Sequence, residues 1–234
     1  MNRHALFTVL DATWPPAASH KAGPWTIRDG QGGGKRVSAA SAAGAWTPDD
    51  IPQAEAALAA LGQPPLFMIR DSDAELDAAL SARGYSFTDP VVAFAAPVTG
   101  FPAPARMTAF PHWPPLRIAA DLWAEAGIGP ARLAVMHRVT APKTVILGRT
   151  ADRASGAAFV AVHLETAMLH ALEVTPALRR QGSANNMLRA AAHWAQDHGA
   201  TQLSLVVTFA NEGARHLCAS HGMQVVGQYH YWQK

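Results

Sequence analysis

The sequence predicts an α/β protein, and two patterns in its C-terminal part support this fold class. Residues 144–148, 157–163 and 167–174 are three successive apolar stretches of strand length, joined by the short turns TADRASG and HLET. After them, apolar residues recur at positions 184, 187, 188, 191 and 195 with the i, i+3, i+4 spacing of a helix. Strands are therefore followed by a helix along the same stretch of chain.

Shorter elements complete this part of the chain. Residues 117–126 and 130–139 have helical patterns, and residues 203–207 alternate as a strand. Asn211 is a suitable N-cap for a further helix that Gly222 ends, and residues 224–232 form a last strand.

The N-terminal part repeats this mixture. Strands are predicted at residues 25–28, 36–39, 66–70 and 85–95, and helices at residues 51–61 and 72–83. The glycines of DGQGGGKR, residues 29–36, would form a hairpin loop between the first two strands. Strand, short helix, glycine and strand occur at residues 66–95 and again at 203–232. The six prolines within residues 97–115 mark a boundary, which predicts domains of residues 1–98 and 99–234.

Composition limits the function classes. The formal net charge of +2 is too small a bias to indicate nucleic-acid binding. The single cysteine, Cys218, excludes a disulfide framework and a cysteine-rich zinc site, and it suits a reducing compartment. The six fairly apolar residues before Asp11 are too few for a signal-peptide core, and no stretch approaches the ~20 apolar residues of a membrane span. A cytoplasmic protein with no metal, nucleic-acid or membrane partner is therefore expected.

The stretch LRRQGSANN, residues 178–186, is the best candidate binding site. It follows a predicted strand and opens a predicted helix, whose first backbone N–H groups have no partner inside the helix. Together with the helix dipole, these groups attract anions. Glycine lets a phosphate approach the backbone, and the two arginines add charge-assisted contacts. An ordinary helix start is the alternative interpretation.

The second glycine-rich stretch fits a phosphate site less well. A P-loop needs G-x-x-x-x-G-K-[ST] between a strand and a helix. Gly34-Lys35 is followed by Arg36, and Asp29 stands where the first glycine belongs, so a P-loop enzyme is disfavoured. A cysteine nucleophile built on Cys218 and His221 is also disfavoured, because no orienting acid follows them.

Three pieces of the C-terminal part, in order, resemble the GNAT acetyltransferase superfamily: LEVTPALRRQGSA, LSLVV and NEGARHLCASHGM. The resemblance covers residues 142–232 and implies a mixed, mostly antiparallel, splayed sheet flanked by helices, the GNAT acyl-CoA acyltransferase fold. Residues 1–98 resemble a degenerate GNAT-like unit, as in tandem members. Since this unit lacks an Arg-x-x-Gly-x-Ala turn, it is not expected to bind a cofactor.

The resemblance implies an acetyl-CoA-dependent N-acetyltransferase, in which an amine attacks the thioester directly in a ternary complex. The acceptor is expected to be a small molecule. A non-catalytic acyl-CoA-binding or regulatory module is the alternative. The C-terminal QYHYWQK segment either packs across a homodimer or closes the sheet.

The resemblance also assigns cofactor contacts by position. The sheet should splay between strands 167–174 and 203–207, and the cofactor should enter that gap. The pantetheine arm would meet the backbones of Leu172 and Val174 and the side chain of Asn211. The pyrophosphate would bind the turn formed by Arg179, Arg180, Gln181, Gly182, Ser183 and Ala184.

Catalysis requires a base and an acid. An alkylamine is neutral in only about one of 2,500 molecules at pH 7, so a base must take its proton. The candidates are Glu165, His163, His170, Glu173 and His230. Simple alternation places His170 on the face of Leu172 and Val174, with Glu173 on the other face.

The departing thiolate also needs a proton, which family members often take from a tyrosine. Cys218 occupies that position in this sequence. Cys218, Tyr229 and Tyr231 are therefore the candidate donors, and a packing role is the alternative for Cys218.

Overall fold

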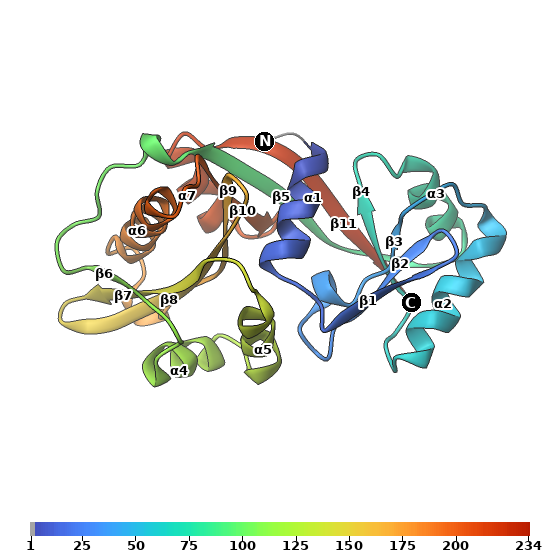
Figure 1. Ribbon diagram of the computed structural model, residues 1–234, viewed down its shortest axis with the longest axis horizontal. Coiled ribbons are helices and arrows are strands. Elements are labelled where there is room, and N and C mark those ends of the chain that lie inside the picture. The colour runs from blue at the N-terminus through green and yellow to red at the C-terminus, as the bar shows by residue number, and fades with distance from the viewer. Residues whose placement is uncertain (1–2) are drawn as a thin grey trace.

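The computed structural model describes residues 3–234 and shows two groups of elements joined by one long sheet (Figure 1). Its eight strands lie in the order β4-β11-β5-β10-β9-β8-β7-β6. All neighbours are antiparallel except β9 and β10, which confirms the mixed, mostly antiparallel sheet. The C-terminal group comprises β6 (Ala109–His112), α4 (Arg117–Glu125), α5 (Pro130–Arg138), β7 (Lys143–Thr150), β8 (Arg153–His163), β9 (Thr166–Val174), α6 (Ser183–Asp197), β10 (Gln202–Thr208), α7 (Glu212–Ser220) and β11 (Gln224–Gln233).

The N-terminal group has a small antiparallel sheet of its own, with the strand order β1-β2-β3. The predicted helices and long strands of this group are confirmed, whereas α1, β1, β3 and the later strand β6 carried no clear sequence pattern. The group comprises α1 (Arg3–Thr13), β1 (Ala18–Ala22), β2 (Trp25–Asp29), β3 (Ser41–Ala42), α2 (Ile51–Ala60), β4 (Leu66–Arg70), α3 (Ala74–Ala82) and β5 (Ser86–Pro97).

The two groups exchange strands. β5 follows the strand–helix pair β4–α3, yet it pairs with β10 of the C-terminal group. β11 follows the equivalent pair β10–α7, yet it pairs with β4 of the N-terminal group. β5 and β11 also pair with each other, and Figure 1 shows both running from one group to the other. The domain boundary at residues 98/99 remains a prediction. The main sheet contains strands from both sides of that boundary.

The hairpin predicted around DGQGGGKR is wrong. β2 pairs with β1 and β3, and residues Lys35–Val37 form a 3-10 turn instead of a strand. The glycines allow this stretch to fold tightly against α5, since a Cβ on Gly33 would lie 2.6 Å from Val135 Cγ2. Val37 is fully buried. Burial of Val37 therefore accounts for the apolar pattern that resembled a strand.

The core lies on both faces of the sheet. Met187, Leu188, Ala191 and Ala195 of α6 are buried against one face, as the helical spacing predicts. Each fully buried side chain of leucine size contributes about 1.5–3 kcal/mol. α4 and α5 cover the other face around Trp123.

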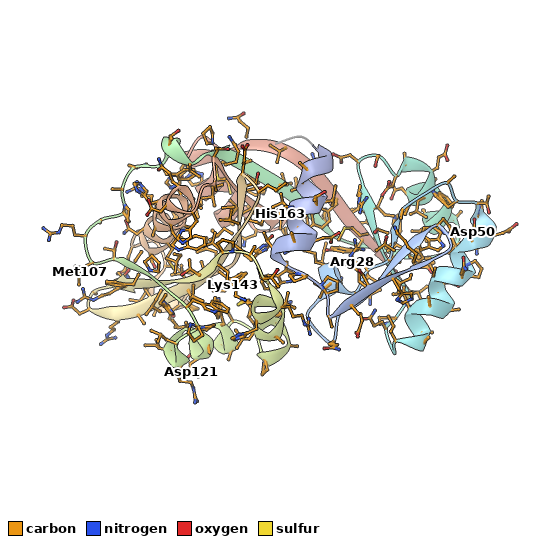
Figure 2. All side chains as sticks on the ribbon, viewed as in Figure 1. Arg28, Asp50, Met107, Asp121, Lys143 and His163 are labelled. Carbon is orange, nitrogen blue, oxygen red and sulfur yellow. The ribbon has the colours of Figure 1, made fainter. Side chains whose placement is uncertain are left out.

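α1 lies between the two groups of elements (Figure 1). It packs Leu6 and Leu10 against β11 and neighbouring strands. The buried Arg28 of β2 forms an ion pair with the half-buried Asp11 of α1 at 3.1 Å, and Figure 2 shows Arg28 in the space between α1 and the small sheet. Within residues 3–234, no helix has the length and apolarity that a membrane span requires.

Candidate functional site

The main sheet opens between its two parallel strands. β9 and β10 pair from Thr166↔Gln202 to Leu169↔Leu205. Beyond that point both strands continue, to Val174 and Thr208, without pairing. A cleft of about 510 Å³ occupies the opening, and its lining includes His170, Leu172, Glu173, Asn211, Arg36, Tyr229 and Tyr231. The predicted splay is therefore present at the predicted place.

The predicted anion-binding turn lies between β9 and α6. Arg180 and Gly182 both have positive φ, 63° and 85°, and Gly182 is the N-cap of α6. In the described part of the chain, the backbone N–H groups of residues 181–184 donate to no protein acceptor. A Cβ on Gly182 would meet nothing within 4 Å, so the space beside these donors is open. Free N–H groups at a helix N-terminus provide the chemistry that a pyrophosphate requires.

Two contacts fix this helix end against the sheet. The Ser183 hydroxyl lies 2.7 Å from that of Ser155 on β8, and both side chains are buried. A Cβ on Gly148 of β7 would lie 2.9 Å from Ser183 Oγ, so the close approach of α6 depends on a glycine there. The arginines before the turn are less constrained, although Arg179 Nε donates to the Val174 carbonyl at 3.0 Å.

Two of the three predicted pantetheine contacts, Leu172 and Asn211, lie along the cleft, whereas Val174 is not part of its lining. Leu172 lines it beyond the last β9–β10 pair, where no neighbouring strand occupies that edge of β9. Asn211 also lines it, and its side-chain oxygen accepts from the Ala214 N–H at 3.0 Å as the N-cap of α7. The Asn211 amide group keeps its two N–H donors for a ligand.

A β-bulge corrects the predicted orientation of Glu173. Phe159 pairs with His170, but Ala157, two residues earlier on β8, pairs with Glu173, three residues later on β9. The extra residue coincides with a positive φ of 50° at Ala171. An inserted residue reverses the alternation of side chains, so His170 and Glu173 share a face. Both line the cleft.

Both ring nitrogens of His170 are engaged. The Thr13 hydroxyl donates to the Val9 carbonyl at 2.7 Å, so it accepts from His170 Nε2–H at 2.9 Å. His170 Nδ1 then accepts from Arg36 Nη1 at 3.2 Å, since a guanidinium can only donate. Burial, followed by the nearby Arg36 charge, holds the pKa of His170 well below its usual value. His170 is therefore a neutral acceptor that positions Arg36.

Tyr229 and Tyr231 bring two hydroxyl-bearing rings from β11 into the cleft. Their rings meet edge to face at 5.7 Å, and the Tyr229 hydroxyl accepts from Arg36 Nε at 3.3 Å. Burial, with the neighbouring Tyr229, raises the pKa of Tyr231 well above its usual value. A phenol at this place holds its proton at neutral pH, although its raised pKa makes it a weaker acid than a phenol in water.

The other candidate acids and bases lie elsewhere. Cys218 is fully buried in the core under α7, and burial raises the pKa of its thiol to about 12. His163 ends β8 and Glu165 lies in the turn that follows, at the closed end of the β9–β10 pair. His230 lies outside the cleft and contacts Asp77 Oδ1 at 2.7 Å. The structure thus brings His170 and Tyr229 together, but not Cys218 or Glu165.

Burial raises the pKa of Glu173, although the charges of Arg179 and Arg132 oppose that shift. A carboxyl group whose pKa moves up towards neutrality is a better proton acceptor for catalysis. Two of the candidate bases, His170 and Glu173, line the cleft. Both ring nitrogens of His170 are engaged, so Glu173 is the better candidate for the base. Simple alternation of side chains along the strand predicts Glu173 on the face opposite to His170, so that prediction was wrong.

Most of the charged and aromatic cleft residues that sequence reasoning missed come from the N-terminal part, and Arg132 of α5 is the exception. Arg36 and Trp14 line it beside His170, with the Trp14 ring centroid 4.9 Å from the imidazole. Lys35 also lines it and pairs with Asp89 at 2.7 Å. The only sequence signal was the run of glycines before Lys35, which indicated a loop without indicating its destination.

The start of α2 in the N-terminal group corresponds to the start of α6, but it carries acidic residues where the turn before α6 carries arginines. Asp50 accepts hydrogen bonds from the Thr47 backbone N–H and hydroxyl at 2.7 and 2.9 Å. Asp49 adds a second negative charge in the same turn before α2. Negative charges beside this helix end disfavour the binding of a phosphate there.

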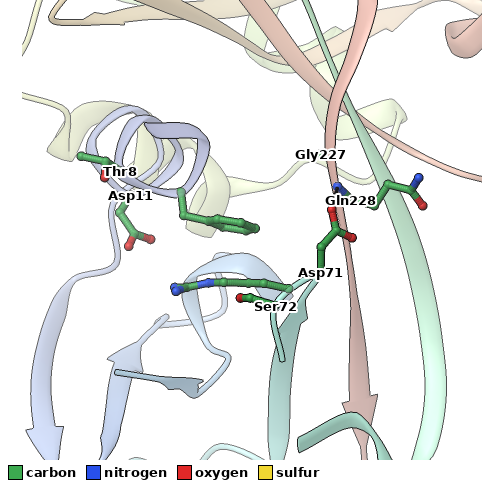
Figure 3. Close-up of a pocket in the computed structure, with 8 residues that line it drawn as sticks. Thr8, Asp11, Asp71, Ser72, Gly227 and Gln228 are labelled. Atoms are coloured by element: carbon green, nitrogen blue, oxygen red, sulfur yellow. Dashed lines mark hydrogen bonds between the residues drawn. The ribbon is translucent and has the colours of Figure 1, made fainter. Parts of the chain in front are cut away.

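A separate cavity of about 420 Å³ lies at the junction of the two groups. Figure 3 shows Thr8 and Asp11 of α1 on one side and Gly227 and Gln228 of β11 on the other. It includes neither the α6 turn nor Glu173. Across residues 3–234, no three or more histidine, cysteine, aspartate or glutamate side chains gather as a metal site would require.

Comparison with known proteins agrees with this geometry. Residues 118–223 match the family model described as Acetyltransferase (GNAT) family. No curated protein matches the sequence. The fold resembles that of a GCN5-related N-acetyltransferase from Kribbella flavida, with a TM-score of 0.75 and 16% identity over 100% of this chain and 96% of the other.

Two further solved structures share the fold over nearly the whole chain. A functionally unknown protein from Staphylococcus epidermidis has a TM-score of 0.70 at 11% identity and covers 97% of this chain and 96% of its own. A tandem GNAT protein from the clavulanic acid biosynthesis pathway has a TM-score of 0.64 at 12% identity, with coverages of 98% and 87%. The chain therefore has a GNAT fold that includes the N-terminal group.

Proposed function

We propose that this protein is an acetyl-CoA-dependent N-acetyltransferase that acts on a small-molecule amine. The observation that carries the proposal is the cleft between β9 and β10, with a turn of unpaired N–H groups at residues 181–184 nearby. Arg179 and Arg180 add positive charge beside those donors. Because the space at Gly182 is open, a pyrophosphate can reach the backbone.

Acetyl-CoA supplies an acetyl group on a thioester, and the protein must then manage two protons. Glu173 takes the proton of the attacking amine, directly or through one water, as the nitrogen bonds to the carbonyl carbon. The carbon–sulfur bond breaks, and Tyr229 or Tyr231 gives a proton to the departing thiolate. Each role rests on a side chain that lines the cleft. Cys218 and Glu165 have no role in this scheme.

The N-terminal group shapes the acceptor side of the cleft in this proposal. It contributes Trp14, Lys35 and Arg36 to the lining. We assign no second cofactor to it, because Asp49 and Asp50 stand at the start of α2. Residues 1–98 thus serve as a degenerate unit whose task is to complete the cleft.

Isothermal titration of CoA and acetyl-CoA tests the cofactor turn. Gly182→Glu places bulk and negative charge beside the N–H donors and should abolish binding. Gly199→Glu is the matched control, since Gly199 has nearly the same φ, 84° against 85°, and equally open space at the other end of α6. Loss of binding in both variants, or in neither, would contradict the assigned turn.

A non-catalytic acyl-CoA-binding module is the second candidate. The replacement of the family tyrosine by the buried Cys218 favours it, whereas the two tyrosines in the cleft oppose it. Thiol release from acetyl-CoA with a panel of amines separates the two functions. CoA binding without amine-dependent thiol release would identify the module.

A further inference from the structure

Arg36 is a charged side chain in the cleft with no acidic partner. Among the described residues, no aspartate or glutamate oxygen lies within 4.0 Å of its guanidinium. Asp89, an acid in the lining, is paired with Lys35 at 2.7 Å. Arg36 is half-buried. Partial removal of a cation from water is costly when no counter-charge is near, and an anionic ligand would offset that cost.

The groups that hold Arg36 are neutral. Nη1 donates to His170 Nδ1 at 3.2 Å and Nε donates to the Tyr229 hydroxyl at 3.3 Å. His170 is itself fixed through Nε2 to Thr13 at 2.9 Å. These bonds engage two of the five guanidinium donors and fix the orientation of the group, but they do not neutralise its charge.

The loop that carries Arg36 is rigidly placed. Gly33 N–H donates to the Gly30 carbonyl at 2.8 Å, and the Ser38 hydroxyl donates to the Gly34 carbonyl at 3.1 Å. Gly34 has a φ of 100°, which a residue with a side chain rarely adopts. The glycine run therefore serves to deliver Arg36 to the cleft, which the sequence alone did not indicate.

We infer that the acceptor carries a carboxylate beside its amine and that Arg36 binds this carboxylate. The CoA pyrophosphate is not the anion concerned, because the turn at residues 181–184 lies outside the cleft lining that contains Arg36. Apart from the Lys35–Asp89 ion pair, the cleft lining carries the guanidinium groups of Arg36 and Arg132 and the carboxylate of Glu173. Those charges complement a molecule with a carboxylate and an amine, as in an amino acid. This inference rests on the proposed function and specifies its substrate class.

Matched acceptor pairs provide the test. Thiol release from acetyl-CoA is measured with free amino acids and with their primary carboxamides, which keep the amine and lose the negative charge. The wild type should favour the carboxylate form by about 10- to 100-fold in kcat/KM, the range expected for a charged hydrogen bond. Arg36→Met should bring the ratio close to one, mainly through KM, and Arg36→Lys should keep part of it.

Arg132→Met is the control, because Arg132 also lines the cleft but makes no hydrogen bond to His170 or Tyr229. It should leave the carboxylate-to-carboxamide ratio unchanged. CoA titration on each variant reports whether the cofactor site remains folded. Equal use of acids and carboxamides by the wild type would overturn the inference, as would an Arg36→Met variant that keeps the preference.

A second measurement separates this inference from the proposed function. N-acetylated amino acids and their carboxamides are titrated into wild-type and Arg36→Met protein, with and without CoA. If the protein neither binds CoA nor releases thiol, the proposed function fails. Carboxylate binding that needs Arg36 would still support the subsite, and binding that is absent or independent of Arg36 would overturn it.

Discussion

The hydroxyl of Ser155 lies 2.7 Å from that of Ser183, and both side chains are buried. One belongs to β8 and the other is the first residue of α6. The bond therefore fixes the helix end that forms the proposed anion site. A buried hydroxyl that loses its partner keeps the desolvation cost without the hydrogen bond.

A double-mutant cycle on this pair should show coupling. Ser155→Ala and Ser183→Ala should each lower the free energy of unfolding by about 1–3 kcal/mol, since each leaves one hydroxyl unpaired. The double variant should cost clearly less than the sum, because no unpaired hydroxyl remains. Urea denaturation measures all four free energies. Additive losses would show that the two hydroxyls do not interact.

Glu173→Gln should lower kcat by about 10²- to 10⁴-fold at neutral pH, the usual contribution of a general base. In the wild type, kcat/KM should fall as the pH drops through the raised pKa of Glu173. Glu165→Gln is the matched control from the β8–β9 turn and should keep the wild-type profile. A profile that Glu173→Gln leaves unchanged would assign the base elsewhere.

Glu173→Gln should lower kcat but raise the stability of the folded protein at neutral pH. A carboxyl group whose pKa is raised by folding favours the folded state below its unfolded pKa, and this contribution is lost as the pH rises through the folded pKa. Glu173→Gln should therefore raise the melting temperature relative to wild type at pH 7 more than at pH 4. Thermal unfolding at the two pH values provides the comparison.

Cys218→Ala should leave turnover unchanged. Full burial and a thiol pKa raised to about 12 keep this side chain protonated and out of the cleft. The loss of packing should cost about 1 kcal/mol of unfolding free energy. Thiol reagents should modify Cys218 in urea but not in the native protein. A large loss of kcat in a fully folded variant would return Cys218 to the mechanism.

Cutting the chain between the two groups should not separate them. Residues 105–107 are exposed in the segment after β5, and Met107 is 64% exposed. Figure 2 shows Met107 on the outer loop of the C-terminal group. A specific protease site introduced there should be cut readily. The two fragments should elute together in size-exclusion chromatography, since β5 lies between β10 and β11.

Denaturant should release the fragments, which provides the control for complete cleavage. Fragments that part in native buffer would contradict the strand exchange. They would also favour two independent domains divided near residues 98/99.

The turn at residues 179–184 and the helix that follows it could be predicted from sequence because their signals are local. Gly182 and the N–H donors after it lie within a few positions, between a strand and a helix that each have a clear period. The contacts of Arg36 with His170 and Tyr229 could not be predicted, since these residues are 134 and 193 positions away from Arg36 in the sequence. The face of Glu173 was wrong because nothing in the sequence marks Ala171 for a positive φ. The exchanged strands have ordinary strand patterns, which do not specify their partners.

The strand exchange also has a consequence during synthesis on the ribosome. β5 is made well before either of its neighbours, because Gln202 begins β10 and Gln224 begins β11. Its apolar residues 91–96 are all buried in the finished sheet. Until both later strands emerge, this stretch has two unpaired edges, a state that favours aggregation. We therefore expect the unfinished chain to aggregate more readily than the finished protein.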